Sequence, residues 1–107
     1  MEFEWDELKN RSNRQKHGIG FEEAIVIFKD DGRLTEVGHQ VAGERRDQTI
    51  GRAQADITLL VVHTRRFKDG GRLVTRVISA RPASRKERQR YDEARKNRPL
   101  QTKGPDG

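Results

Sequence analysis

The chain has 107 residues, with 23 Lys and Arg against 17 Asp and Glu and a net charge of +6, which is the size of one small domain. It contains no cysteine, which excludes disulfides, thiolate metal sites and a cysteine nucleophile. It has no apolar run long enough to span a bilayer, and its acidic N-terminus lacks the apolar segment of a secretory signal, so we expect a cytoplasmic protein.

The N-terminal third predicts a short strand and two helices. Apolar and acidic residues alternate over residues 3–6, which indicates a strand whose last residue, an aspartate, is a typical N-cap. A polar helix is expected over residues 7–17, with Leu8 as its only aliphatic residue and Gly18 as its C-terminal stop. Helical spacing of apolar residues predicts a second helix over 21–29 with one apolar face. That face would consist of Phe21, Ala24, Ile25 and Phe28.

The middle of the chain changes to the two-residue period of strands. Weak strands are predicted over residues 34–41 and 48–52. Residues 57–64 are aliphatic on both faces, which is typical of a central strand. The Lys-Asp-Gly-Gly run over 68–71 predicts a hairpin turn, with a return strand over 72–81.

The C-terminal part predicts a basic helix and a tail. Pro82 ends the return strand, and the spacing of Ser84 and Glu87 is that of a capping box that opens a helix to about residue 96. Residues 97–107 are rich in Pro and Gly and are expected to be a disordered tail. Taken in order, these elements predict an α+β fold and a single domain over residues 1–96.

The predicted hairpin brings chemically suggestive side chains together. A two-residue turn would place His63 opposite Arg76, with Arg65 on the same face of the sheet. An imidazole can move a proton at neutral pH, and guanidinium groups bind phosphate oxygens in pairs. The competing interpretation is a buried, hydrogen-bonded histidine flanked by solvated arginines.

The charge of the chain is concentrated in its second half. Residues 1–64 hold 9 basic and 12 acidic side chains, whereas residues 65–107 hold 14 and 5. A basic half favours a nucleic-acid partner, and the alternative is a solvated surface without a specific ligand. Tyr91 could stack on a base or pack against the sheet. The three histidines lack metal-ligand spacing, so no metal site is expected.

Seven stretches of the chain, in order over about residues 2–95, form one joint pattern. These stretches are Phe3-Glu-Trp-Asp6, Asn13-x-x-Lys16-His17-Gly18-Ile19-x-Phe21-Glu-Glu-Ala24, Gly43-Glu44-x-Arg46, Ile50-Gly51-Arg52, Leu60-Val-Val-His-Thr64, Arg76-Val-Ile-Ser-Ala-Arg81 and Glu87-Arg88-x-x-Tyr91. Together they resemble the BrnT family of toxins. Each piece is short, and the specificity of the resemblance lies in their joint order and spacing.

The resemblance implies a RelE-like ribonuclease, the toxin of a type II toxin–antitoxin pair. The family fold would pack two N-terminal helices on an antiparallel sheet, with a basic C-terminal helix. The implied substrate is RNA, specifically mRNA, cut without metal or cofactor by attack of the 2′-OH. The implied partner is a BrnA-like antitoxin with a ribbon-helix-helix part, which would form a hetero-oligomer with the toxin and alone contact operator DNA. No membrane is involved.

The resemblance also implies roles for particular side chains. We expect arginines to bind the phosphate and the transition state, and His63 to act as the acid or base. The expected catalytic residues are His63, Arg65, Arg76 and Arg81, and the expected RNA-binding residues are Lys16, His17, Arg85, Arg88 and Tyr91. The alternatives are a non-catalytic basic nucleic-acid-binding regulator and a protein that only docks an acidic partner.

Overall fold

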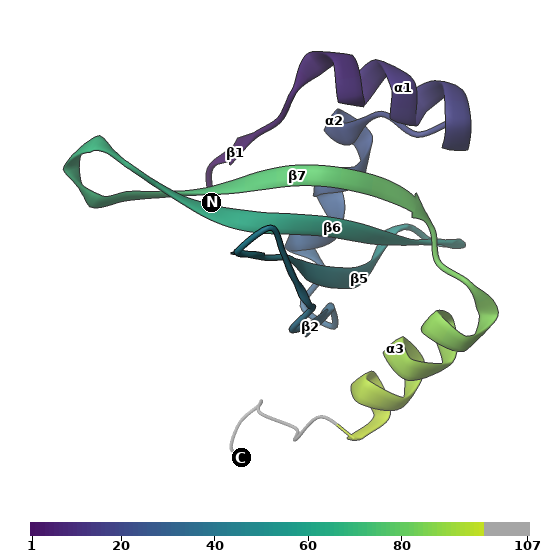
Figure 1. Cartoon of the computed structure of the whole chain (residues 1–107). Coiled ribbons are helices and arrows are strands. Elements are labelled where there is room, and N and C mark those ends of the chain that lie inside the picture. Colours follow the sequence, from purple (N-terminus) through teal and green to yellow (C-terminus); the bar gives the residue numbers. More distant parts are fainter. Residues whose placement is uncertain (98–107) are drawn as a thin grey trace.

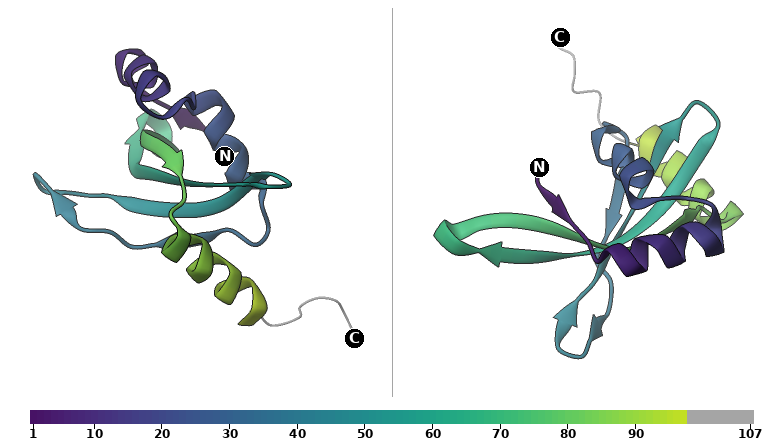
Figure 2. Two further views of the ribbon diagram at one scale, coloured as in Figure 1. Left: turned by 90° about the vertical axis from the view of Figure 1, so that its right-hand side faces the viewer. Right: turned by 90° about the horizontal axis from the view of Figure 1, so that it is seen from above.

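The computed structural model describes residues 1–97 and has a five-stranded sheet with helices on both faces (Figures 1 and 2). The α+β class is confirmed. The tail predicted over 97–107 lies outside the described residues except for Asn97, the last residue of helix α3 (Arg85–Asn97). The strand order is β1-β7-β6-β5-β2. The strands are β1 (Phe3–Glu4), β2 (Leu34–Glu36), β5 (Asp47–Gln54), β6 (Ile57–Lys68) and β7 (Arg72–Pro82).

Helix α1 (Glu7–His17) has the predicted bounds and caps, but it does not dock through its aliphatic residue. Asp6 accepts a hydrogen bond from the Leu8 amide at 2.9 Å, and Gly18 adopts φ 74° at the other end. Leu8 is 70% exposed, whereas Asn10 and Asn13 are buried. The side-chain amide of Asn13 donates to the Ala80 carbonyl at 2.8 Å and accepts from the Ala80 amide. Helix α1 is therefore held on β7 by Asn13, while Asn10 accepts a hydrogen bond from the Phe21 amide of the next helix at 2.8 Å.

The second predicted helix, over 21–29, is wrong as a single α-helix. It consists of α2 (Phe21–Ala24) followed by the 3-10 helix η1 (Ile25–Lys29). The tighter winding of the 3-10 turn changes which side chain faces inward. As a result Ile27 is fully buried, and Phe28 lies at the edge of the core, with its ring centroid 5.2 Å from that of Phe3.

The strand predicted over 34–41 is also wrong in its extent. β2 ends at Glu36, and the chain then forms a separate hairpin of β3 (Gln40–Val41) and β4 (Glu44–Arg45). Gly38 lies so close to the Arg46 carbonyl that a Cβ on it would be 1.8 Å from that oxygen. Only a glycine tolerates such a backbone approach, so the chain turns out of the sheet at this point.

The central position predicted for residues 57–64 is confirmed, because β6 is the third strand of the five. Its side chains alternate between two cores. Leu59 and Val61 belong to the core under α1 and α2, and Leu60 belongs to the core under helix α3 (Arg85–Asn97). Figure 2 shows these helices on opposite sides of the sheet. No helix within residues 1–97 is long and apolar enough to cross a membrane.

The predicted register of the β6–β7 hairpin is wrong. The turn is the three-residue 3-10 element η2 (Asp69–Gly71), so Lys68 pairs with Arg72 and not with Gly71. A β-bulge then shifts the register again between Val62 and His63. Because of the turn, His63 lies opposite Val77 and Arg76 lies opposite Thr64; because of the bulge, Arg81 lies opposite Leu60.

One edge of the sheet is formed by β1, which runs parallel to its neighbour. β1 pairs with β7 in parallel, so the sheet is not wholly antiparallel as the resemblance implied.

At the end of β7, the capping box predicted from Ser84 and Glu87 is confirmed. The Ser84 amide donates to Glu87 Oε1 at 2.8 Å, and the Glu87 amide donates to Ser84 Oγ at 3.2 Å.

Candidate functional site

The four side chains expected to form one catalytic group lie on two faces of the sheet. His63 and Arg65 are on the α1–α2 face, because they alternate with Val61 of that core. Arg76 and Arg81 are on the α3 face, opposite Thr64 and Leu60 of β6. They are five residues apart and would face opposite ways in a regular strand, so the bulge in β7 is what puts them on one face.

His63 is buried, with 8% of its surface exposed. Its Nε2 lies 2.8 Å from Thr49 Oγ1, and its ring meets Phe28 edge to face with centroids 5.2 Å apart. Burial lowers the pKa of His63; the nearby carboxylate of Asp47 opposes this shift and Arg65 adds to it. The environment is that of the buried, hydrogen-bonded histidine considered as the competing interpretation.

The lowered pKa of His63 predicts a dependence of stability on pH. As pH falls through about 6.5, the unfolded chain takes up a proton at this position before the folded protein does, so the free energy of unfolding decreases. One such group contributes a slope of up to about 1.4 kcal/mol per pH unit. The free energy of unfolding, measured with urea at pH 5, 6, 7 and 8, should change less steeply with pH for His63→Gln than for the wild type. Equal slopes would contradict this account.

Arg76 is held by a carboxylate from the N-terminus. Its Nη1 lies 3.1 Å from Glu4 Oε2, and Lys68 Nζ lies 2.9 Å from the other oxygen of Glu4. The hydrogen bond from Lys68, followed by that from Arg76, lowers the pKa of Glu4. The Arg76 side chain is 29% exposed, so part of its guanidinium remains open to solvent on the α3 face.

Arg81 is fixed at the start of helix α3. Its two terminal nitrogens each donate to one oxygen of Glu87 at 2.8 Å, a two-pronged pair. Hydrogen bonding from Arg81 lowers the pKa of Glu87 to about 2. Because Glu87 is also held by Ser84 in the capping box, the guanidinium has little freedom to move. The Arg81 side chain is still 40% exposed.

Two expected RNA-binding residues line one hollow where β7 ends and α3 begins. His17 and Arg88 face a hollow of about 400 Å³ together with Pro82 and Ala83. Arg88 also donates to the Ala83 carbonyl at 3.0 Å. Lys16 precedes His17 in helix α1 and Arg85 lies about one helical turn before Arg88 in helix α3, and both side chains are exposed. We call the group His17, Lys16, Arg81, Arg85 and Arg88 the β7–α3 corner.

Within residues 1–97, three basic side chains of the corner, those of Lys16, Arg85 and Arg88, form no ion pair. Their charges are therefore available to a polyanion at the surface. This distinguishes these three side chains from the paired Arg76 and Arg81 and makes the corner the strongest candidate for an anionic ligand.

Tyr91 does not offer its ring to a base. It is 1% exposed in the core under α3, and its hydroxyl donates to Asp30 Oδ2 at 2.5 Å. Burial and this hydrogen bond raise the pKa of Tyr91 to about 12. The guanidiniums of Arg52 and Arg95 lie 5.8 and 5.6 Å from its ring centroid. Of the two expectations for Tyr91, packing against the sheet is the one observed.

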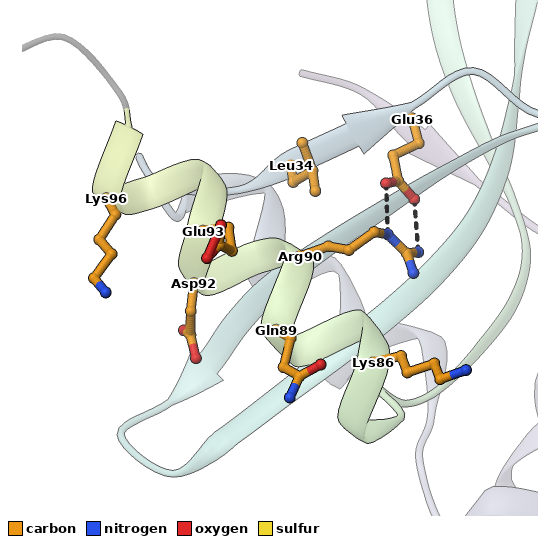
Figure 3. A pocket seen from close by; sticks show the side chains of 8 residues that line it. All are labelled: Leu34, Glu36, Lys86, Gln89, Arg90, Asp92, Glu93 and Lys96. Carbon is orange, nitrogen blue, oxygen red and sulfur yellow. Dashed lines mark hydrogen bonds and ion pairs between the residues drawn. The ribbon is translucent and has the colours of Figure 1, made fainter.

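A hollow of about 800 Å³ between α3 and β2 does not favour RNA (Figure 3). Its charged lining is balanced, with three basic and three acidic side chains. Arg90 donates to both oxygens of Glu36 at 2.9 and 3.0 Å, as Figure 3 shows. This hollow therefore supplies no excess positive charge. Its charged lining consists of Lys86, Arg90, Lys96, Glu36, Asp92 and Glu93.

Sequence reasoning missed the carboxylates that hold the predicted basic residues. Glu4 reaches Arg76 from the other end of the chain, and Glu87 reaches Arg81 across a strand-to-helix turn. Asp47 lies beside His63 because β5 pairs with β6. The capping-box spacing marked Glu87 as a helix residue, but no spacing rule links these acids to their bases. Within the described part of the chain, no three His, Asp or Glu side chains are grouped so as to hold a metal ion.

Comparisons with known proteins agree on one family. Residues 5–87 match the family model described as the ribonuclease toxin, BrnT, of type II toxin–antitoxin systems. The chain is similar to a solved structure, that of the Brucella abortus ribonuclease toxin BrnT. The two are 28% identical, with a TM-score of 0.54, over 79% of this chain and 99% of the other. No curated protein sequence matches.

Proposed function

Because the chain belongs to the BrnT family of ribonuclease toxins of type II toxin–antitoxin systems, we propose that it is an endoribonuclease that cuts mRNA in the cytoplasm and so inhibits translation and growth. The observation that carries the proposal is the β7–α3 corner. There His17 and Arg88 line one hollow together with Asp56, and Arg81, at the end of β7, is held by Glu87 but half-exposed. A fixed guanidinium and basic side chains without ion pairs suit a phosphate backbone.

The proposed reaction is attack of a 2′-OH on the adjacent phosphorus, without a metal ion. The attacking hydroxyl loses its proton, a bond forms from its oxygen to phosphorus, and the bond to the 5′-oxygen breaks as that oxygen gains a proton. Negative charge builds up on the phosphoryl oxygens in the transition state. A pre-positioned arginine stabilises that charge without further reorganisation. We assign this role to Arg81, with Arg76 on the same face as a second ligand.

Proton transfer is assigned differently from the initial expectation. His63 is buried and hydrogen-bonded to Thr49, so its ring is closed to a substrate. His17 lines the hollow at the β7–α3 corner and supplies the only imidazole of that group. We therefore propose His17 as the proton carrier and give His63 a structural role.

The proposed partner is a BrnA-like antitoxin that neutralises the toxin in a hetero-oligomer. A type II system pairs a toxin with a protein antitoxin, which supports the existence of such a partner. The ribbon-helix-helix part of the antitoxin would contact operator DNA, and the toxin would reach that DNA only through it.

The proposal predicts the chemistry of the RNA ends. Purified protein incubated with a long single-stranded RNA in EDTA should leave 2′,3′-cyclic phosphate or 3′-phosphate ends, because the 2′-OH is the attacking group. End-specific labelling of the fragments measures this. Intact RNA with salt-sensitive binding, both free and on translating ribosomes, would instead support a non-catalytic regulator. Cleavage on ribosomes alone would show that the enzyme acts on translated mRNA.

A further inference from the structure

The distal part of the β6–β7 hairpin projects from the body of the sheet (Figures 1 and 2). β5 begins at Asp47, which pairs with His63, so residues 64–68 of β6 pair only with β7 among the described residues. On the other side of β6, Thr64 Oγ1 donates to the Arg45 carbonyl at 2.8 Å, and no strand within residues 1–97 pairs with residues 65–68, which leaves them as a sheet edge. Such an edge is a template for an additional strand.

One face of this projecting hairpin has its charges paired. Every basic side chain there lies within ion-pair distance of a glutamate. The pairs are Arg66–Glu44 at 2.9 Å, Lys68–Glu4 at 2.9 Å, Arg72–Glu2 at 2.9 Å and Arg76–Glu4 at 3.1 Å.

The opposite face is apolar with a single cation. Phe67 pairs with Leu73 across the two strands, and they are 74% and 48% exposed. Arg65 lies two residues along the same face and forms no ion pair within residues 1–97. We call Arg65, Phe67 and Leu73 the hairpin apolar face. A large aromatic ring left this exposed beside an open strand edge is typical of an interaction site.

We propose that an extended acidic and apolar segment of the antitoxin adds as a strand to the edge of β6 and covers the hairpin apolar face. This inference rests on the proposed toxin–antitoxin function for the existence of that partner. Side chains of a strand alternate, so the segment would place an acidic residue beside Arg65 and an apolar one beside Phe67. A hollow of about 490 Å³ lined by Arg45, Thr64 and Arg65 leaves room beside this edge.

Charge argues against a second copy of this chain as the occupant. Three of the four residues over 65–68 are basic. A symmetric antiparallel pairing of two such edges would set Arg65 of one copy opposite Lys68 of the other, and like charges directly opposite are destabilising. An acidic segment would instead be attracted to the basic side chains of the same edge.

The test uses the full chain and the full-length antitoxin of its own operon. The double variant Phe67→Ser/Leu73→Ser and the single variant Arg65→Glu should each raise the Kd at least tenfold. Leu8→Ser, which removes an aliphatic side chain of similar exposure from α1, should leave the Kd within twofold. Amide hydrogen exchange over residues 65–68 of the wild type should slow in the complex, because strand addition occupies those groups.

Unchanged affinity in both hairpin variants, or unchanged exchange over 65–68, would overturn the inference. RNA cleavage by the free proteins is measured in parallel. A double variant that cuts RNA like the wild type but has lost antitoxin affinity supports the docking surface. If the wild type cuts no RNA while the same loss of affinity is seen, the ribonuclease proposal fails and the docking surface stands.

Discussion

Replacing Arg81 by alanine is expected to reduce the rate of RNA cleavage at least a hundredfold while leaving the protein folded. Removal of one pre-positioned group that stabilises charge in a transition state typically costs about 10² to 10³ in rate. The guanidinium pairs with Glu87 on a half-exposed surface, where such a pair contributes about 1 kcal/mol or less to stability. Initial cleavage rates measure the loss of activity, growth arrest on induction measures the loss of toxicity, and the urea midpoint measures stability.

Matched variants separate charge from geometry. Arg81→Lys keeps the positive charge but loses the two-pronged contact, so an intermediate rate is expected. Arg76→Ala removes the second arginine of the α3 face and should also relieve growth arrest. Arg72→Ala is the control, because Arg72 lies on the same strand and also pairs with a glutamate, but lies far out on the hairpin. Full activity of Arg81→Ala would show that Arg81 does not bind the scissile phosphate.

Replacing Asn13 by alanine is expected to lower the free energy of unfolding by about 3 kcal/mol, because buried polar groups lose their partners. The Asn13 side chain donates to the carbonyls of Ile19 at 3.0 Å and Ala80 at 2.8 Å and accepts from the Ala80 amide at 3.2 Å. Alanine leaves all three backbone groups without these bonds. Urea unfolding followed by circular dichroism measures the difference.

The control for Asn13 is the aliphatic residue of the same helix. Leu8 is 70% exposed, so Leu8→Ala should change the free energy of unfolding by less than about 0.5 kcal/mol. Hydrophobicity alone predicts the reverse order. A larger loss for Leu8→Ala than for Asn13→Ala would mean that α1 docks through apolar contacts after all.

The type and order of most elements could be predicted from the sequence, because caps and periodicity are local signals. Asp6, Gly18 and the Ser84–Glu87 box placed helix ends correctly. The docking of α1 could not be predicted in the same way. Asparagine is a polar residue in any periodicity argument, and only the tertiary structure shows that Asn10 and Asn13 satisfy buried backbone groups.

The composition of the candidate site depended on the register of one hairpin. A turn of three residues in place of two moved Arg76 to the opposite face from His63, and one bulge in β7 then placed Arg81 on the same face as Arg76. Neither feature has a sequence signal here, since the Asp-Gly-Gly run is compatible with both turns. Two residues expected to bind RNA, His17 and Arg88, line one hollow, but no local spacing in the sequence predicts that they meet.

The Arg81–Glu87 pair affects how steeply the affinity for RNA falls as the salt concentration rises. A phosphate that binds Arg81 must displace the carboxylate of Glu87. Binding at this position therefore exchanges one anion for another and does not neutralise a free cation. The displaced carboxylate stays in the complex and keeps part of the surrounding cation atmosphere with it. Fewer ions are then released for each phosphate bound, and affinity falls less steeply with ionic strength than a net charge of +6 suggests.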